Sequence, residues 1–299
     1  MNKRGVIRIA PRMWNPFPPF DEGLVPIRVD EGTKADEEYG YLDTKGRLVI
    51  TPRYRWGGGF FRGRALVDLH GKLTLIDKSG GTVKVLGPFG NASPFAEGVA
   101  AICINDKWGF VNARGKTVIP LRYDNAFSFS EGLAPAKMGQ SWGFIGHNGK
   151  WVIAPIYEFT RPFQEGLASV LIGGKFGFIN RKGQEVIKCH YDAVKDFAER
   201  MAPVKIAGRW GYINKAGNTV IEPKYTEAYS FSEGLAVASN GSLEGYIDHS
   251  GRFELTPQYQ FALPFDRGLA EVDFGRAFSK RLPAYINHQG EIIWKADSE

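Results

Sequence analysis

The chain has 299 residues, of which 43% are hydrophobic and 23% charged, the composition of an ordinary soluble globular protein with enough apolar residues for a substantial core. Its 37 glycines and 13% aromatic residues are typical of short, half-buried strands joined by tight turns, and helix signals are scarce. The formal net charge of +6 permits an anionic partner, but the basic residues are scattered among 32 acidic ones and form no run.

The N-terminal segment MNKRGVIRIAPRMW starts basic, but its apolar stretch is interrupted by Arg8 and stopped by Pro11, which makes it too short for a secretion signal. No window approaches a transmembrane span. Cys103 and Cys189 lie in different repeats and have no partner motif, so neither a disulfide framework nor a zinc site is indicated. We expect a reduced, cytoplasmic protein with no metal or other cofactor; export by a signal-independent route stays open.

A pattern of 34 residues recurs along the chain. In residues 129–157 it reads Phe-x-Glu-Gly, then Trp-Gly, then Val-Ile and Pro-x-Tyr. The first Phe keeps this interval in six copies and the aromatic before Gly in four of them, at Phe95, Phe129, Phe163, Phe197, Phe231 and Phe265 and at Trp108, Trp142, Phe176 and Trp210. Two worn copies, around Phe20 and Phe60, precede these and bring the number to eight.

Each copy predicts four short strands, a to d. In the fourth copy, strand a is Gly132 to Ala136, strand b the Trp-Gly-Phe-Ile stretch, strand c the Val-Ile stretch, and strand d Tyr157 to Phe163. Between b and c each copy carries Asn or Asp (Gly once), two variable residues and Gly, which predicts a tight turn closed by a glycine of positive φ. One carboxylate for each turn is too few for calcium.

The repeated Trp-Gly phrase resembles that of the WG-repeat (KWG-repeat) family, over almost the whole chain from about Phe20 to Trp294. This resemblance implies a largely bacterial protein with β-propeller-like repeats that serves as an interaction module. Four copies depart from the phrase by losing the Trp, with Tyr39, Leu73, Glu244 and Ala284 in its place.

Four-stranded units repeated around an axis form a propeller, and the same units stacked in a line form a solenoid. The last copy stops at Trp294 without a strand d, whereas Ile9 to Trp14 resembles a passage from strand c to strand d. We predict an all-β fold, a repeat β-propeller of about eight blades of ~34 residues in which an N-terminal strand closes the last blade, as a single domain over residues 1–299. Seven blades, or an open β-solenoid of antiparallel meanders, are the alternatives.

The connection between strands a and b is longer in the first and last copies. From the Leu of strand a to the aromatic of strand b is 11 residues in copies two to seven, but 17 from Leu24 to Tyr41 and 16 from Leu269 to Tyr285. Irregular loops on a rigid scaffold favour binding, and an Arg with a Phe is a typical anchor pair. In a closed ring the two loops would be neighbours, so the alternative is that they clasp its seam. The candidate partner-binding residues are Asp36, Glu37, Arg276, Phe278, Lys280 and Arg281.

Two other repeated features have a structural and a functional interpretation. The aromatic of the Trp-Gly pair could form ligand pockets, as in repeat lectins, but such a residue is more often core, with the glycine making room for it. The Glu that follows the anchoring Phe, and the basic residue before the aromatic, could hold ions. A glutamate beside a glycine turn more often accepts backbone N–H bonds or pairs across blades.

Catalytic motifs are absent from the sequence. Cys189 and His190 are adjacent and would point to opposite faces of a strand, the wrong geometry for a thiolate and its base, and the turn residues His147, His249 and His288 are predicted to be exposed. We therefore expect a non-enzyme, a protein–protein interaction scaffold, in one form an immunity or adaptor protein whose partner is a toxin. It would be monomeric alone and would bind through one propeller face, without membrane. A glycan- or nucleic-acid-binding propeller is the alternative, although nucleic acid is disfavoured, and a loop-built enzyme ranks last.

Overall fold

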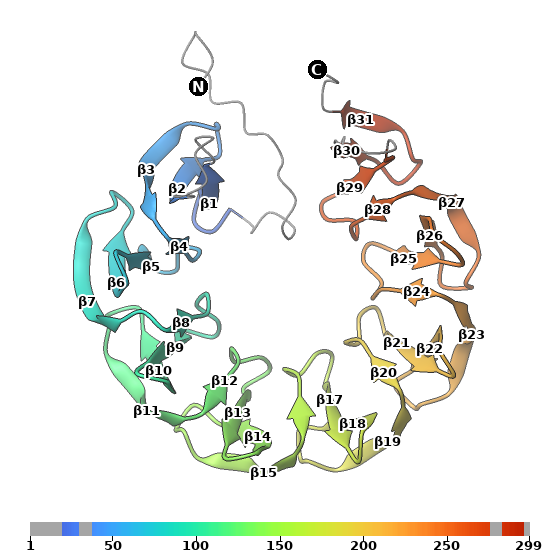
Figure 1. The fold of residues 1–299 in the computed structure, drawn as a ribbon, viewed down its shortest axis with the longest axis horizontal. Helices are drawn as coiled ribbons and strands as arrows, with labels where there is room; N and C mark the ends of the chain where they lie inside the picture. Colours follow the sequence, from blue (N-terminus) through green and yellow to red (C-terminus); the bar gives the residue numbers. More distant parts are fainter. Residues whose placement is uncertain (1–19, 30–37, 276–282, 296–299) are drawn as a thin grey trace. The chain divides into compact units, whose positions relative to one another are not determined.

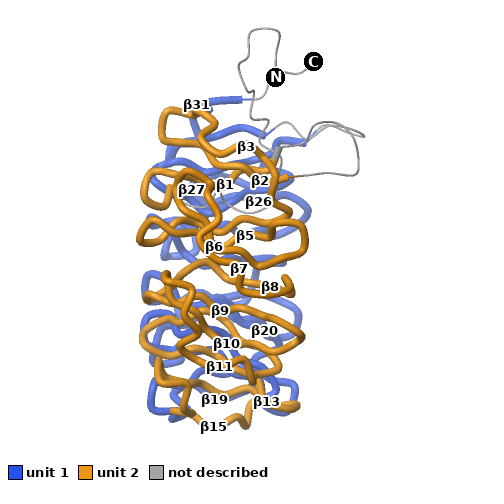
Figure 2. Tube along the Cα trace, turned by 90° about the vertical axis from the view of Figure 1, so that its left-hand side faces the viewer, with its two compact units in different colours: residues 1–12, 158–299 blue, residues 13–157 orange. Residues whose placement is uncertain are grey.

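The computed structural model describes residues 20–29, 38–275 and 283–295, and every regular element within these ranges is a β-strand (Figure 1). The chain divides into two compact units (Figure 2): unit 1 comprises residues 1–12 and 158–299, and unit 2 comprises residues 13–157. The described residues of each unit form four antiparallel sheets, numbered one to eight in chain order.

Unit 2 holds sheets one to four, each a meander of strands that follow one another in sequence. Sheet one has three described strands and the others have four. In each four-stranded sheet of this unit, a strand of two residues lies at one edge and a strand of seven residues at the other. The strands of unit 2 are β1 (Leu24–Val29), β2 (Glu38–Asp43), β3 (Leu48–Tyr54), β4 (Trp56–Gly57), β5 (Arg64–Leu69), β6 (Lys72–Asp77), β7 (Thr82–Pro88), β8 (Asn91–Ala92), β9 (Val99–Ile104), β10 (Lys107–Asn112), β11 (Thr117–Tyr123), β12 (Asn125–Ala126), β13 (Ala134–Met138), β14 (Ser141–Ile145) and β15 (Trp151–Tyr157).

Unit 1 holds sheets five to eight, built in the same way. Figure 1 shows the long strands β19, β23 and β27 along the outer side of the arc that these sheets form. The strands of unit 1 are β16 (Phe159–Thr160), β17 (Leu167–Ile172), β18 (Lys175–Asn180), β19 (Glu185–Tyr191), β20 (Ala193–Val194), β21 (Met201–Ile206), β22 (Arg209–Asn214), β23 (Thr219–Tyr225), β24 (Glu227–Ala228), β25 (Ala236–Ser239), β26 (Glu244–Ile247), β27 (Phe253–Tyr259), β28 (Phe261–Ala262), β29 (Ala270–Asp273), β30 (Pro283–Ile286) and β31 (Ile292–Lys295).

A four-stranded antiparallel meander of this kind is a β-propeller blade. The predicted fold class, an all-β repeat β-propeller of about eight blades, is confirmed, and the described residues contain eight sheets rather than seven. The N-terminal strand predicted to close the last blade falls in residues 1–19, which lie outside the described residues.

The short strand belongs to a different sheet from the one predicted. We expected strand d to complete the sheet of its own copy, but strand c continues through its Tyr and the short strand then pairs with strand a of the next copy. One residue, Thr226, separates β23 from β24, too few for a hairpin back onto β23. Glu227 of β24 therefore pairs with Ser239 of β25 in sheet seven. By the same shift, sheet eight has four strands within residues 261–295, although the last copy contributes no described strand d.

The glycine of the Trp-Gly pair lies opposite a bulge. In sheet six, Trp210 pairs with Tyr225 and Tyr212 with Ile221, so two steps along β22 span four along β23. A Cβ added at Gly211 would lie 2.5 Å from the carbonyl oxygen of Ile221. The glycine therefore makes room as predicted, but for the bulged backbone of strand c and not for the aromatic ring.

The turn between strands b and c forms as predicted. In sheet six, Oδ1 of Asn214 accepts hydrogen bonds from the backbone N–H groups of Ala216 and Asn218, both at 3.0 Å. Gly217 closes the turn with φ of 82°, a backbone conformation that is energetically costly for a residue with a side chain. Local chemistry thus fixes the register of strands b and c.

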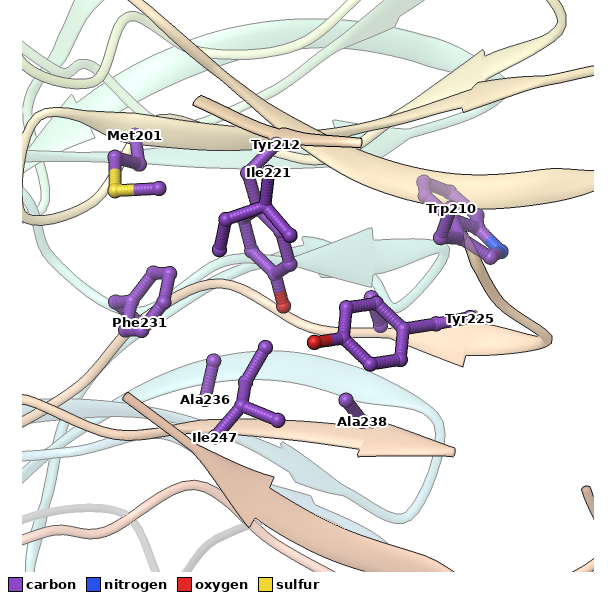
Figure 3. Packing of buried hydrophobic residues seen from close by; sticks show 10 residues of the cluster. Met201, Trp210, Tyr212, Ile221, Tyr225, Phe231, Ala236, Ala238 and Ile247 are labelled. Carbon is purple, nitrogen blue, oxygen red and sulfur yellow. The ribbon is translucent and has the colours of Figure 1, made fainter. Parts of the chain in front are cut away.

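The core lies between neighbouring sheets (Figure 3). One cluster joins sheet six to sheet seven and consists of Met201, Trp210, Tyr212, Ile221, Tyr225, Ala228, Phe231, Ala236, Ala238 and Ile247. The hydroxyl of Tyr225 also donates to the carbonyl oxygen of Gly251 in the turn of sheet seven, at 2.6 Å. Each sheet is therefore stabilised by burial against its neighbour, as in other repeat proteins.

Candidate functional site

Residues 30–37 and 276–282 of the two predicted partner-binding loops lie outside the described residues, and they include all six candidate residues: Asp36, Glu37, Arg276, Phe278, Lys280 and Arg281. β1 ends at Val29 and β2 begins at Glu38, while β29 ends at Asp273 and β30 begins at Pro283. Both long segments therefore connect strands a and b, where sheet six has only the two residues between β21 and β22. The binding role of the six residues stays a prediction.

The repeated glutamate is a clamp between adjacent sheets. The carboxylate of Glu199 accepts a hydrogen bond from the backbone N–H of Gly234 in the next sheet at 3.1 Å, and Glu199 itself has φ of 50°. Glutamates at this place in other sheets make the same bond to the next sheet, as in Glu22 to Gly63, Glu97 to Gly132 and Glu233 to Gly268. The interpretation that this glutamate accepts backbone N–H bonds across blades is confirmed.

A cationic or histidine side chain from the strand b–c turn of the same neighbouring sheet completes the clamp. Lys215 Nζ lies 2.9 Å from Glu165 Oε2, and His249 Nε2 lies 3.0 Å from Glu199 Oε2. Burial alone would raise the pKa of Glu165, but the hydrogen bonds from Lys215 and from the Arg200 N–H more than offset it and lower that pKa. The carboxylate of the clamp thus contacts both a charged side chain and backbone N–H donors.

The three turn histidines are part of this arrangement. The ring of His249 stacks on that of Phe231, the anchoring Phe of its own sheet, with centroids 4.2 Å apart and an interplanar angle of 10°. His147 on Phe129 and His288 on Phe265 repeat the stack. His147 and His249 are exposed as predicted, whereas His288 is half-buried.

The basic residue before the aromatic is also paired. Lys107 Nζ lies 2.6 Å from Asp124 Oδ1, and the other oxygen of Asp124 accepts from the N–H of Gly139 in the next sheet at 2.6 Å. The hydrogen bond from Lys107, followed by that from Gly139, lowers the pKa of Asp124. Lys175 and Asp192 form the same pair at 2.5 Å. These groups join neighbouring parts of the scaffold.

The aromatic ring of the Trp-Gly pair packs against the residue that follows the short strand of its own sheet. In sheet four, Trp142 is 5% exposed and stacks on Phe127, with centroids 5.1 Å apart and an interplanar angle of 15°. This agrees with the core interpretation of the repeated Trp and gives a reference for the other sheets.

A charged side chain replaces one member of this apolar pair in each of sheets six and seven. Lys195 follows β20, at the place that Phe127 holds after β12, and Glu244 begins β26, at the place of Trp142. The ammonium of Lys195 lies 3.4 Å from the ring centroid of Tyr229 and 5.0 Å from that of Trp210. Oε2 of Glu244 accepts a hydrogen bond from the backbone N–H of Ala262 at 2.6 Å. We call Lys195, Trp210, Tyr229 and Glu244 the polar cluster.

Burial perturbs both charged groups of the polar cluster. It lowers the pKa of Lys195 to about 8, although Glu227 and Glu244 act in the opposite direction. It also raises the pKa of Glu244, against the effects of the Ala262 N–H and of Lys195. The indole N–H of Trp210 is buried and donates no hydrogen bond to any described residue. The polar cluster therefore combines two partly buried charges with a buried indole N–H that has no acceptor among the described residues.

Sequence reasoning noted Glu244 only as a lost Trp and missed Lys195. The usable signal was the substitution at two fixed places of the repeat, the residue that follows the short strand and the residue before the strand b glycine. The sequence did not show that these two places belong to the same sheet, because the prediction had assigned the short strand to the wrong sheet.

Catalytic or metal-binding groupings do not emerge from the described residues. No group of three or more His, Cys, Asp or Glu side chains there could hold a metal ion. Burial raises the thiol pKa of Cys189, and His190 Nδ1 contacts the carbonyl oxygen of Lys188 at 2.8 Å. No helix long and apolar enough to cross a membrane occurs in the part of the chain that the structure describes.

Fold and side-chain roles together define an all-β repeat protein of the β-propeller class. The family described as WG containing repeat matches residues 39–72, 88–108, 108–140, 142–176, 176–210, 210–243 and 245–275. The chain belongs to this WG-repeat family, as its sequence resemblance indicated, and the match is to a repeat and not to a catalytic family. Repeat β-propellers are typically protein-interaction scaffolds.

A search of curated proteins gave no match. Among solved structures, the crystal structure of a eukaryotic initiation factor has a TM-score of 0.49 and 10% identity, over 86% of this chain and 93% of that one. Kluyveromyces lactis Hsv2 has a TM-score of 0.44 and 10% identity, over 79% and 96%. Likenesses at this level carry no conclusion about function.

Proposed function

We propose that this WG-repeat chain is a non-catalytic scaffold that binds another protein through the face carrying the strand a–b connections. The repeated polar groups support this proposal, because the glutamates, the turn cations and the basic residues before the aromatic are engaged in bonds between neighbouring parts of the scaffold. Groups used in this way are not available to a ligand. Binding is then left to positions where the repeat departs from its pattern.

The two long strand a–b connections are the largest such departures. Their candidate residues are Asp36 and Glu37 in the first and Arg276, Phe278, Lys280 and Arg281 in the last. An arginine and a phenylalanine on a loop supported by rigid strands are typical interface anchors. In its specific form, the proposed protein is a bacterial immunity or adaptor protein that forms a single domain over residues 1–299. It is monomeric alone and binds a partner such as a toxin.

A cytoplasmic location is part of the proposal. It is supported by the two free cysteines, Cys103 in β9 and Cys189 in β19. Free thiols persist in reducing compartments, whereas secreted proteins usually oxidise them. Alkylation of the native protein with and without reductant, followed by mass spectrometry, measures their state.

Replacement of residues 276–282 by the two-residue connection between β21 and β22 tests the docking face and leaves in place Phe274, whose ring contacts Tyr259. We expect the shortened chain to lose its partner in a pull-down from the native cytosol, and to lose affinity for the purified partner by at least tenfold in calorimetry, because the anchor residues are gone. Its melting temperature should stay that of the parent chain. Arg209→Ala, which removes an exposed arginine beside the turn of sheet six, is the matched control and should bind normally.

Two outcomes would overturn the proposal. A shortened chain that unfolds at a markedly lower temperature would make the long segment a structural clasp. Retention of nucleic acid, with affinity that falls steeply as salt rises, would place the chain among nucleic-acid-binding propellers instead.

A further inference from the structure

The polar cluster lies along the short strands of sheets six to eight, apart from the long strand a–b connections. Lys195 follows β20, Tyr229 follows β24, and Ala262, the backbone partner of Glu244, belongs to β28. All of its members belong to unit 1. Figure 3 shows the ring of Trp210 at the end of the hydrophobic cluster, away from Met201 and Phe231.

The packing of sheet four shows that two aromatic side chains can fill these places, although the residue after the short strand varies and is Ser93 in sheet three and Arg161 in sheet five. In sheet four, two aromatic rings stack with an interplanar angle of 15°, and neither side chain is itself charged. Placing Lys195 and Glu244 at the corresponding places buries two charges at a cost that packing does not require. Proteins keep such locally unfavourable groups mainly where they serve a function.

Lys195 is held in position but is not paired. Contacts with the rings of Tyr229 and Trp210 fix its ammonium by cation–π attraction. Among the described residues no carboxylate forms an ion pair with it, although the charges of Glu227 and Glu244 act on it. An oriented ammonium without an oxygen acceptor is suited to bind a carbonyl oxygen.

Glu244 supplies a hydrogen-bond acceptor, whereas Lys195 supplies a donor. One carboxylate oxygen accepts from Ala262, and the other accepts no hydrogen bond from any described residue. Glu244 is only half-buried, so a group from outside can reach it. A ligand here would place an acceptor at Lys195 and a donor at Glu244.

The charges around the polar cluster balance. Arg161, Lys195 and Lys205 face Asp196, Glu227 and Glu244, and Arg161 lies 3.9 Å from Asp196. A phosphate would meet three carboxylates, and a cation would meet three positive side chains. A neutral group with both a donor and an acceptor avoids both repulsions.

We propose that the polar cluster binds an amide of a partner polypeptide, with Lys195 donating to the amide carbonyl and Glu244 accepting from the amide N–H. A backbone peptide group and an Asn or Gln side chain both offer this pair of atoms. This site rests on the proposed scaffold function, which it extends by a second contact point outside the long loops.

Selection from a phage-displayed library of random dodecapeptides tests the site on the full chain. Peptides enriched on the parent protein should lose about tenfold or more in affinity on Lys195→Met, because a charged donor disappears. Glu244→Gln, which keeps an acceptor but removes the charge, should cost about threefold. Lys137→Met, the same kind of change beside Trp142 in sheet four, should leave the affinity unchanged.

Three results would overturn the site. They are no peptide enrichment on the parent protein, equal affinities of the enriched peptides for the parent and for Lys195→Met, and binding of simple glycosides but not peptides to the polar cluster. Far-UV circular dichroism confirms the folding of each variant, and the near-isosteric Glu244→Gln keeps the test valid if Lys195→Met does not fold.

Failure of this site is distinguishable from failure of the proposed scaffold function. If the shortened 276–282 variant loses the partner while no peptide binds the polar cluster, the scaffold function stands and this site falls. If peptides bind the polar cluster but no protein partner depends on the long loops, the docking face falls and this site stands.

Discussion

Sheet four and the pair of sheets six and seven share one backbone but differ in what they place beside the short strand. Sheet four stacks Phe127 on Trp142, and sheets six and seven hold Lys195 between rings with Glu244 nearby. The bulge, the strand b–c turn and the strand order are the same in both regions. The comparison teaches that the backbone of this repeat does not depend on the Trp of the Trp-Gly pair, whereas both regions keep its glycine opposite the bulge.

Trp142→Glu is the change expected to have the largest effect. It imposes the sheet seven residue on sheet four, where the ring is 5% exposed and stacked, and where no lysine corresponds to Lys195. We expect a loss of about 3–5 kcal/mol in the free energy of unfolding, since a buried aromatic is lost and a charge is buried. Urea unfolding measures it. A loss below about 1 kcal/mol would mean that the stack does not stabilise sheet four.

Gly143→Ala and Gly245→Ala test what the two regions have in common. Added Cβ atoms would lie 2.6 Å from the Ile153 carbonyl oxygen and 2.5 Å from that of Leu255. Both variants should lose about 1–3 kcal/mol of unfolding free energy, because bulged backbone must move. Thermal unfolding measures both. Strongly unequal losses would show that the bulge differs between the regions. Gly241→Ala, where no atom lies within 4 Å of the added Cβ and φ is not positive, serves as the control and should cost less.

Glu244→Gln should raise the free energy of unfolding, whereas the preceding changes should lower it. Burial raises the pKa of Glu244, so its ionised form is disfavoured in the folded chain and its charge costs stability above that pKa. The variant should gain about 0.5–1 kcal/mol near neutral pH, and the gain should shrink as pH falls and the parent carboxylate takes up its proton. Unfolding at several pH values measures this. A loss of stability at neutral pH would mean that the carboxylate stabilises sheet seven.

The pH dependence of Lys195 should appear only at alkaline pH, outside the neutral range in which the other variants are compared. Its pKa is about 8 in the folded chain, below the ordinary 10.5. Between these values the unfolded chain binds more protons, so this group makes the protein more stable as pH rises through that window. The difference in unfolding free energy between the parent and Lys195→Met, measured at pH values across the window, isolates it from the tyrosines. A flat difference would contradict the burial of the ammonium.

Much of the fold was predictable from the sequence because its signals are local. The 34-residue period gave the blade count, and the strand b–c turn formed as the Asn214 to Gly217 pattern predicts. The sheet of the short strand was not predictable in the same way. Its two residues carry no periodicity, and only the single linking residue Thr226 reveals which neighbour it pairs with.

The candidate sites also differ in how well the sequence predicted them. The glutamate clamp was predictable because a carboxylate beside a glycine turn has few other partners. The polar cluster was not, because Lys195 and Glu244 lie 49 positions apart and meet only through the pairing of short strands across sheets. The long connections could be located by counting, and their six candidate residues remain predictions.

The central claim is that the regular positions of the repeat stabilise the fold, whereas the positions that depart from the repeat pattern bind a partner. Lys195→Met tests it most directly when urea unfolding and peptide titration are run on one preparation. We predict a protein at least as stable as the parent at neutral pH whose affinity for the selected peptides falls about tenfold. A less stable protein with unchanged peptide affinity would contradict the claim and assign Lys195 to the scaffold.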